Sequence, residues 1–291
     1  MIIFSPLAFI FGTCVGSFLN VVILRFPKGE PIIKKRSYCP SCKKTLAWFD
    51  LVPFLSFVFL KGRCRYCGQK ISWQYPLVEG ATGLLFLFSY LVWLQGSINL
   101  ASLPYLLFLF FASSLLFLVF IFDLKYGIIP DGIMLWGVFG WIVYQIIAIL
   151  AKLASLWLGL RASELGRYMI TPQYFFSQLR FWFQDLLWAV VAGLLVAIFF
   201  YALVIITRGR GMGLGDVKFG FLLGLLVSIP KIFTLLFLAF FSGAIVSLIL
   251  IFLGKKKLKE TVPFAPFLSF AALVVLFLGD LLTSVYLEFF P

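Results

Sequence analysis

Residues 185–207 read DLLWAVVAGLLVAIFFYALVIIT, and after the first aspartate this stretch carries no charge. A helix that crosses the hydrocarbon core of a bilayer needs about 20 predominantly apolar residues. In lipid, only a helix or a closed barrel satisfies every backbone N–H and C=O group. The stretch therefore predicts a transmembrane helix, and the fold class depends on how often this pattern recurs along the chain.

Similar apolar runs fill most of the sequence. The chain of 291 residues is 63% hydrophobic and 12% charged, against roughly 45–50% and 25% in a typical soluble domain. We expect an all-α polytopic membrane bundle of about eight transmembrane helices. Seven is the alternative, because the sixth run is short and only Pro230 separates it from the seventh. The runs are residues 2–24, 77–95, 102–122, 132–151, 185–207, 216–229, 231–253 and 263–286.

Basic residues gather in alternate connections between these runs, namely 25–76, 123–131, 208–218 and 254–262. Loops rich in Lys and Arg stay in the cytosol, so we expect these four inside and the N-terminus outside. The net charge of +13 then reflects contact with lipid surfaces rather than nucleic acid. The first run has no basic residue before it, which argues against a cleavable signal peptide.

The polar segments complete the expected organisation. Residues 51–60 are apolar but too short to span a bilayer, so they form a core or an interfacial segment. The loop 152–184 mixes aromatic residues with arginines, which is typical of structure lying on a membrane. The expected parts are a first transmembrane helix (1–24), a small cytosolic zinc-binding domain (25–76) and a transmembrane bundle (77–291).

Four of the five cysteines form two Cys-x-x-Cys pairs with 21 residues between them: Cys39, Cys42, Cys64 and Cys67. Two such pairs at this separation are typical of a zinc ribbon, and four thiolates around one point suit a tetrahedral zinc ion. The alternatives are two disulfides or four free thiols that bind no metal, although disulfides are rare in the cytosol. A closed four-sulfur site leaves no position for substrate, so the predicted zinc is structural. The fifth, Cys14, lies in the first run and reads as a small buried residue.

The chain has no histidine, which excludes a Ser-His-Asp triad, a Cys-His pair and zinc proteases of the H-E-x-x-H type. Peptide hydrolysis would have to use carboxylates or a lysine base. Asp123 ends the third run and Asp216 opens the sixth, both at the expected cytosolic edge. Acidic groups at membrane depth are costly and mark functional sites.

A carboxylate pair can hydrolyse peptides when one member is ionised and activates water while the protonated member polarises the scissile carbonyl. Glycines 213 and 215 precede Asp216 and would let the backbone adopt unusual φ angles and approach a substrate. Other roles remain open: Asp216 could cap its helix, Asp123 could pair with Lys125, and Asp131 could cap the fourth span. Asp185 and Asp280 are expected near the outer interface and outside the pair.

Taken together, these motifs resemble the prepilin leader peptidase family, membrane aspartic proteases with a G-x-G-D motif. The resemblance covers nearly the whole chain and rests on motifs in the same order as in the family. They are Gly16-Ser17-Phe18-Leu19-Asn20-Val21-Val22 with Arg25 and Pro27, the cysteine pairs, Ile71-Ser72, Tyr75-Pro76, Glu79, Thr82-Gly83, Asp123 with Ile129-Pro130-Asp131, Gly213-Leu214-Gly215-Asp216-Val217-Lys218, Pro263-Phe264 and Pro266-Phe267.

The resemblance implies Asp123 and Asp216 as the catalytic pair, supported by Gly213, Gly215 and Lys218. It also implies two activities in the bacterial inner membrane: cleavage after the glycine that ends a prepilin or pseudopilin leader, and N-methylation of the new N-terminus with S-adenosylmethionine. Glu79 stands where the family has a glutamate linked to methyl transfer, although it could simply favour the start of a helix.

A few positions depart from the family pattern, including Gln74, Gly80-Ala81 and Ala265, and none touches the aspartates.

Two other functions remain as alternatives. One is a protease without methyl transfer, as in preflagellin peptidases, against which the cysteine domain argues. The other is a non-enzymatic membrane scaffold or transporter that carries a zinc ribbon.

Overall fold

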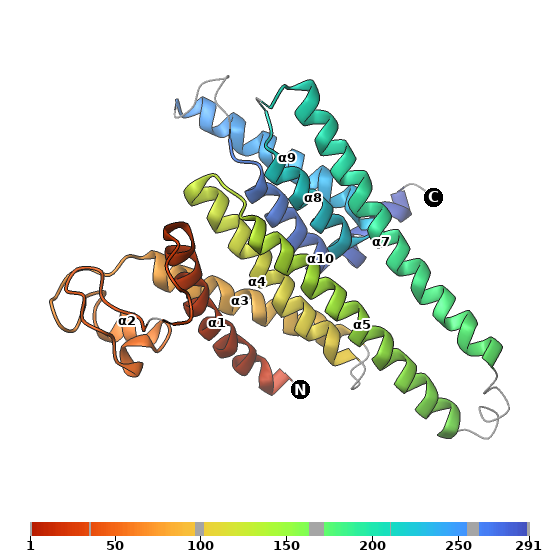
Figure 1. Cartoon of the computed structure of the whole chain (residues 1–291), viewed down its shortest axis with the longest axis horizontal. Helices are drawn as coiled ribbons and strands as arrows, with labels where there is room; N and C mark the ends of the chain where they lie inside the picture. Colours follow the sequence, from red (N-terminus) through yellow and green to blue (C-terminus); the bar gives the residue numbers. More distant parts are fainter. Residues whose placement is uncertain are drawn as a thin grey trace. The chain divides into compact units, whose positions relative to one another are not determined.

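The computed structural model describes residues 2–34, 36–96, 102–162, 172–209, 211–254 and 262–289, and within these ranges the chain is helical, with two isolated β-bridges. Figure 1 shows the helices and their order. They are η1 (Ile2–Phe4), α1 (Ser5–Arg25), η2 (Phe26–Lys28), η3 (Trp48–Leu51), α2 (Leu55–Phe59), α3 (Gln74–Gln95), α4 (Leu103–Tyr126), α5 (Asp131–Ala162), α7 (Pro172–Ile206), α8 (Leu214–Val227), α9 (Lys231–Phe252) and α10 (Ala265–Phe289).

Each of the eight predicted runs corresponds to one of these helices, with ends that differ by a few residues, which confirms the all-α membrane bundle. Six helices of the described chain, α1, α3, α4, α5, α7 and α9, are long and apolar enough to cross a bilayer. Of the other two, α8 has 14 residues, and α10 runs from Ala265 to Phe289 and begins with the apolar stretch Ala265–Gly279.

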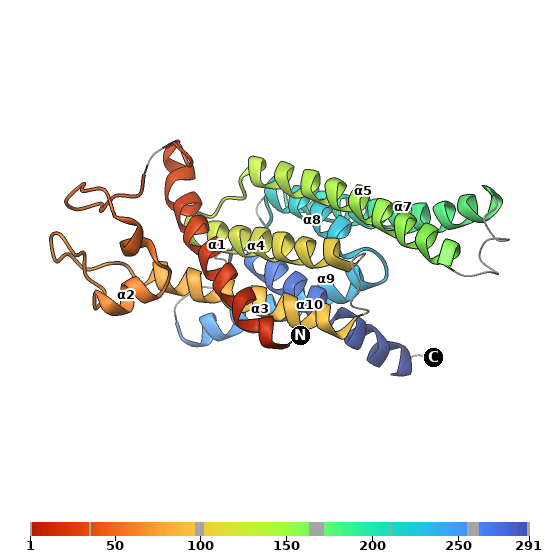
Figure 2. The same ribbon diagram turned by 90° about the horizontal axis from the view of Figure 1, so that it is seen from below.

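The chain divides into two compact units, and α4 contributes to both. The first contains residues 1–98 and 109–118. In this unit α1 and α3 lie side by side, and the segment that carries α2 projects beyond their adjoining ends (Figures 1 and 2). A Cβ atom on Gly16 would come within 2.8 Å of the Glu79 Cα. Small residues let two membrane helices approach closely, and here they bring α1 against the first turns of α3.

The second unit contains residues 99–108 and 119–291. Its short helix α8 contacts α5, α7, α9 and α10, and its side chains Phe219, Leu222 and Leu223 are fully buried. Backbone contact between α7 and α8 at Gly193 and Gly224 leaves no room for a side chain on Gly224. The helix that carries the G-x-G-D motif is therefore held at the centre of its unit.

Helices α5 and α7 continue well past the predicted spans, 132–151 and 185–207. Most of the predicted loop 152–184 is helical, because α5 extends to Ala162 and α7 starts at Pro172. Residues 163–171 lie outside the described part. The two extensions contact each other, since the Lys152 ammonium lies 5.8 Å from the ring centre of Trp182. The described parts of the predicted loop, residues 152–162 and 172–184, are thus helical and continue the flanking spans, and the expected position on the membrane surface stays a prediction.

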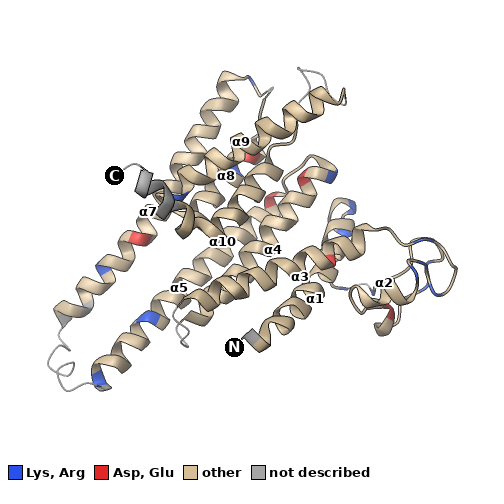
Figure 3. Ribbon diagram, turned by 180° about the vertical axis from the view of Figure 1, so that it is seen from behind, with Lys and Arg blue, Asp and Glu red and all other residues tan. Residues whose placement is uncertain are grey.

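Charged residues concentrate in the segment around α2 and near helix ends, while the helices themselves are largely uncharged (Figure 3). This matches the separation of apolar runs and basic connections in the sequence. The basic residues predicted in 254–262 lie almost entirely outside the described residues, which stop at Gly254 and resume at Val262.

Candidate functional site

The two Cys-x-x-Cys pairs fold into two similar turns. In the first, the Cys39 N–H donates to the Lys44 carbonyl and the Lys43 N–H donates to the Cys39 carbonyl. The second repeats this pattern, with Cys64 bonded to Gln69 and Gly68 to Cys64. Lys43 and Gly68 occupy equivalent places and both have positive φ, 60° and 70°. One antiparallel bridge closes each turn, Tyr38 with Thr45 and Arg63 with Lys70.

These turns bring the four predicted sulfur ligands together. All four Sγ atoms lie within 4.8 Å of one another, and the Cys39 and Cys67 sulfurs are 3.9 Å apart. A tetrahedral ion with Zn–S bonds of about 2.3 Å requires sulfurs separated by roughly 3.8 Å. All four cysteines are free thiols, so the disulfide alternative is not the arrangement found. The donor set fits a four-coordinate metal ion.

The thiols differ in how readily they ionise. Burial alone would raise the pKa of Cys39, but backbone N–H groups of Cys42 and Ser41 bond to its sulfur and bring the pKa down to about 7. The Gln69 N–H acts in the same direction on Cys67, yet desolvation and the three neighbouring sulfurs raise that pKa to about 11. Four thiolates therefore do not persist side by side without a cation, and a bound metal would supply the compensating charge.

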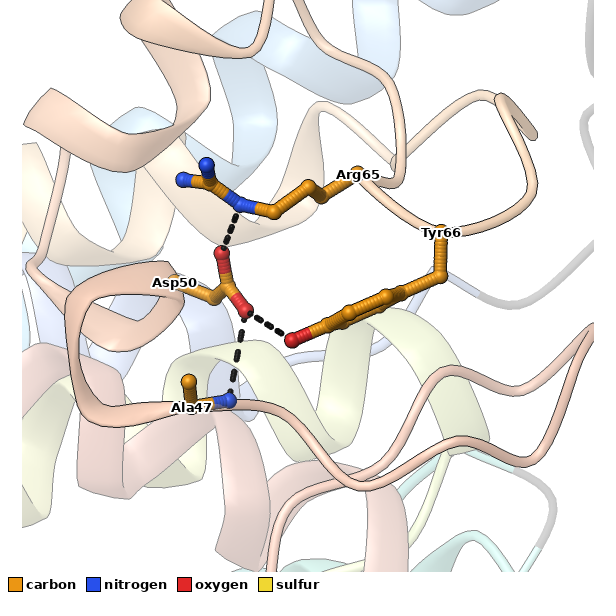
Figure 4. Close-up of polar contacts among 4 residues, drawn as sticks. All are labelled: Ala47, Asp50, Arg65 and Tyr66. Carbon is orange, nitrogen blue, oxygen red and sulfur yellow. Dashed lines mark hydrogen bonds and ion pairs between the residues drawn. The ribbon is translucent and has the colours of Figure 1, made fainter.

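Asp50 joins the two halves of this domain, a role that the sequence analysis did not assign. Its carboxylate accepts hydrogen bonds from the Ala47 N–H at 3.2 Å, the Arg65 Nε at 2.7 Å and the Tyr66 hydroxyl at 3.1 Å (Figure 4). The side chain of Asp50 is only 2% exposed. Burial alone would raise the pKa of Asp50, but Arg65, Ala47 and Tyr66 together hold it below the ordinary value. Arg65 and Tyr66 lie between Cys64 and Cys67, so Asp50 anchors the second turn.

Asp123 lies in the last turn of α4. The helix ends at Tyr126, because Gly127 caps it with a left-handed φ of 64°, and the Gly127 N–H donates the last helical hydrogen bond to the Asp123 carbonyl. The Asp123 side chain is buried, with 7% of the residue exposed. Its carboxylate accepts a hydrogen bond from the backbone N–H of Ala265, the first residue of α10. A helix start offers free N–H donors and a partial positive charge, which suit a carboxylate.

Asp216 lies in the first turn of α8, and its Oδ2 accepts a hydrogen bond of 3.1 Å from the Gly213 N–H. The capping role weighed for Asp216 is thus present. Asp216 is also close enough to Asp123 for the two carboxylates to repel each other. The second unit therefore brings together the two aspartates that the motifs predicted, each held by a backbone N–H at a helix start.

The two motif glycines act differently from our expectation. Gly213 has an extended backbone with φ of −93°, and Gly215 is part of α8, so neither adopts the unusual φ that was predicted. Gly215 instead provides close packing, because a Cβ atom there would lie 3.3 Å from the Ile129 Cβ. Nearby, the Lys218 Nζ lies 2.6 Å from the Asp131 Oδ1. Lys218 thus links α8 to the start of α5, and Asp131 has an ion-pair partner.

Glu79 lies in the first unit, in the second turn of α3, and is 7% exposed. Its Oε2 accepts a hydrogen bond of 2.8 Å from the Phe54 N–H, and the Ser17 side chain is a second partner. Phe54 has φ of 60° and ψ of −50°, and the Leu55 N–H bonds to the Pro53 carbonyl at 2.6 Å. This is a γ-turn with positive φ, a strained conformation. Glu79 thus ties a strained turn of the cysteine domain to α3.

Comparisons with known proteins agree with this arrangement. Residues 10–93 match the model of the bacterial peptidase A24 N-terminal domain, and residues 109–248 match that of the type IV leader peptidase family. The first range holds the cysteines and Glu79, and the second holds both aspartates. No solved structure matches the chain.

Curated relatives align over almost the whole length. A prepilin leader peptidase/N-methyltransferase of Bacillus subtilis is 29% identical over 96% of both chains. A protein of the same description from Aeromonas salmonicida is 30% identical, over 98% of this chain and 94% of its own. A type 4 prepilin-like proteins leader peptide-processing enzyme of Escherichia coli is 32% identical over 94% of both chains.

Proposed function

The chain belongs to the type IV leader peptidase family, and from this we propose that it is a membrane aspartic endopeptidase that removes the leader peptide of prepilins and then N-methylates the new N-terminus. The observation that carries the proposal is the meeting of Asp123 and Asp216, each held at a helix start, in a chain without histidine. We assign residues 77–291 to the peptidase bundle and residues 25–76 to the metal-binding domain.

The carboxylate pair would act as one acid–base unit. Two carboxylates that repel each other share one proton, so one is ionised and the other is protonated. The ionised member removes a proton from water, and the water oxygen attacks the scissile carbonyl carbon. The protonated member donates its hydrogen bond to the carbonyl oxygen. When the C–N bond breaks, the leaving nitrogen takes up a proton and the pair returns to its starting state.

Zinc would be held by the four cysteine thiolates, where it would stabilise the fold of the domain. A closed S₄ set has no open coordination position, so the hydrolysis uses the aspartates alone. We place this domain and the carboxylate pair at the cytosolic face of the inner membrane, with the N-terminus outside. The support is the concentration of Lys and Arg in alternate connections.

For the second activity we propose S-adenosylmethionine as the methyl donor. The new α-amine, once deprotonated, would attack the methyl carbon and release S-adenosylhomocysteine. Glu79 would support this step as a positioning residue, because its carboxylate is already bonded to Phe54 and Ser17. Glu79→Gln keeps one oxygen acceptor for the Phe54 N–H, whereas Glu79→Leu removes it.

The decisive experiment supplies a prepilin peptide to the purified enzyme and measures both products by mass spectrometry. Asp123→Asn and Asp216→Asn should release no leader peptide, but should still methylate a supplied peptide that already has the mature N-terminus. Glu79→Leu should still cleave the leader but should methylate the product poorly. The segment around Phe54 should be more sensitive to protease in Glu79→Leu than in Glu79→Gln. An Asp216→Asn enzyme that still releases leader peptide would refute the mechanism. Poor methylation by Glu79→Leu without any change in protease sensitivity would instead indicate direct contact of Glu79 with the reactants.

A further inference from the structure

The cysteine domain exposes an apolar surface between its two Cys-x-x-Cys turns. We call the exposed side chains of residues 48–59 the apolar ledge. Trp48 is 78% exposed and Phe59 is 80% exposed, and Phe54, Leu55 and Val58 are about half exposed. Contiguous apolar surface on a polar domain marks a site that something else covers.

Two contacts place this ledge beside the first turns of α3. The Phe54 N–H bonds to the Glu79 carboxylate at 2.8 Å. Glu79 is five residues inside α3, roughly 7.5 Å along the helix from Gln74 at a rise of about 1.5 Å per residue. The rings of Phe57 and Trp73 lie 4.9 Å apart. At Phe54 and Phe57, the ledge therefore meets the first turns of a membrane-capable helix.

The surface of α3 at this level is apolar and open. Trp73 is 69% exposed just before the helix, and Leu77 is 65% exposed in its first turn. Since α3 has the length and composition of a membrane span, Leu77 faces lipid at the edge of the hydrocarbon core. The ledge is thus continuous with a surface that the bilayer covers.

The charge around the ledge complements an anionic membrane. Its acidic residue, Asp50, has a side chain only 2% exposed and paired with Arg65. Lys61 and Arg63 follow α2 directly and are exposed. Apolar and aromatic side chains with basic residues beside them are typical of segments that lie in the headgroup region of anionic lipid.

From these contacts we propose that the apolar ledge inserts into the bilayer interface, so that the four-cysteine domain lies on the surface of the anionic leaflet. Trp48 and Phe59 then reach the boundary between headgroups and acyl chains, where tryptophan is enriched in membrane proteins. Lys61 and Arg63 lie level with the lipid phosphates. The domain is held to the membrane by the ledge as well as by the chain connections to α1 and α3.

The test measures the depth of Trp48 in the full-length protein, reconstituted into vesicles of phosphatidylcholine with phosphatidylglycerol. The fluorescence difference between the protein and its Trp48→Phe variant isolates the Trp48 signal. Lipids brominated near the top of the acyl chains report lipid contact, and aqueous iodide reports contact with water. Trp136, which is 68% exposed on α5, provides a reference for a lipid-facing indole through the matched Trp136→Phe difference.

We expect brominated lipid to quench the Trp48 signal, as for an indole at the interface, and iodide to leave it almost unchanged. The Lys61→Gln, Arg63→Gln double variant should lose part of this quenching in anionic vesicles and none in pure phosphatidylcholine. Quenching of Trp48 by iodide but not by brominated lipid would overturn the proposal, because the ledge would face water. Protection from both quenchers would also overturn it, because protein, such as a second copy or the substrate, would then cover the ledge.

Discussion

The four cysteines and the two aspartates are brought together in opposite ways. The cysteines come from two short turns with 21 residues between them, and each turn makes its own backbone hydrogen bonds. The aspartates belong to α4 and α8, far apart in the chain, and lie in the same compact unit, where α8 packs against α5, α7, α9 and α10. One site is formed by two local turns, and the other by the tertiary packing of helices.

This difference predicts how each site fails. Loss of a sulfur ligand removes the ion that holds two small turns together, so the cysteine domain should unfold while the helices remain. Loss of a carboxylate removes chemistry but little packing, so the bundle should remain folded and inactive. The predictions below test this contrast, starting with the largest expected effect.

The aspartate pair should be chemically essential and structurally dispensable. Asp123→Asn or Asp216→Asn should each lower cleavage by about 10⁴-fold or more, and the double variant should be no worse, since residues that act as a unit are not additive. At position 216 the asparagine oxygen still accepts the Gly213 N–H, so the helix start is preserved. Cleavage kinetics and thermal unfolding in detergent measure the two effects.

Asp185→Asn is the matched control for this experiment. Asp185 is exposed on α7, and its replacement should leave cleavage unchanged. Normal cleavage by either active-site variant, or loss of the folded bundle in both, would contradict the assignment.

The cysteine site should show the reverse pattern. Cys39→Ser or Cys64→Ser should abolish zinc binding, which contributes about 10–16 kcal/mol to the folding of small zinc domains. Residues 25–76 should become sensitive to protease while the helices remain folded. Metal analysis and limited proteolysis provide the measurements. Cys14→Ser is the control, because Cys14 lies on α1 and outside the cluster, where it is exposed and not buried as the sequence analysis expected. A Cys39→Ser protein with its full zinc content would refute the four-sulfur site.

A smaller effect should come from the link between the two cysteine turns. Asp50→Asn should weaken the domain by about 1–3 kcal/mol, because its buried carboxylate loses charge-assisted hydrogen bonds. The pKa of Asp50 is below its ordinary value of 3.8. Its contribution is therefore fully present above that value and is lost as the pH falls toward the lower folded-state pKa.

Hydrogen exchange of residues 37–70 as a function of pH measures this contribution. The Asp50→Asn variant should show a flatter acid dependence than the unmodified protein. Tyr66→Phe, which removes only one of the three bonds, should have a smaller effect. Equal acid dependence with and without Asp50 would contradict this role.

The smallest effect should come from the ion pair beside the carboxylates. Lys218 and Asp131 have side chains that are 53% and 68% exposed, and exposed ion pairs contribute about 0.2–1 kcal/mol. Lys218→Gln should therefore lower cleavage only severalfold. Adding Asp131→Asn should have little further effect, since the first change already breaks the pair. A loss comparable with that of Asp216→Asn would mean that Lys218 takes part in the chemistry itself.

Features with a local pattern could be predicted from the sequence. Apolar runs indicated the eight helices, and the cysteine spacing indicated the sulfur cluster. The structural role of Asp50 was not predicted because a single aspartate in a loop belongs to no motif. Its partners Arg65 and Tyr66 become neighbours of Asp50 only after both turns fold. The donor to Asp123 was not predicted because it is the backbone N–H of Ala265, which every residue except proline would provide. The full lengths of α5 and α7 were missed because residues 152–184 mix charged residues with apolar ones and so lack a continuous apolar run.

Those two lengths have a practical consequence. Helix α5 has 32 residues and spans about 48 Å, whereas the hydrocarbon core of a bilayer is about 30 Å thick. At the start of α5, Asp131 pairs with Lys218 of α8. The far end of α5, beside α7, lies roughly 46 Å away along the helix axis. That distant end is a suitable site for an inserted epitope that binds a fiducial antibody fragment for electron microscopy. A particle of this small mass needs such a marker, and here it can be added without approaching the aspartates.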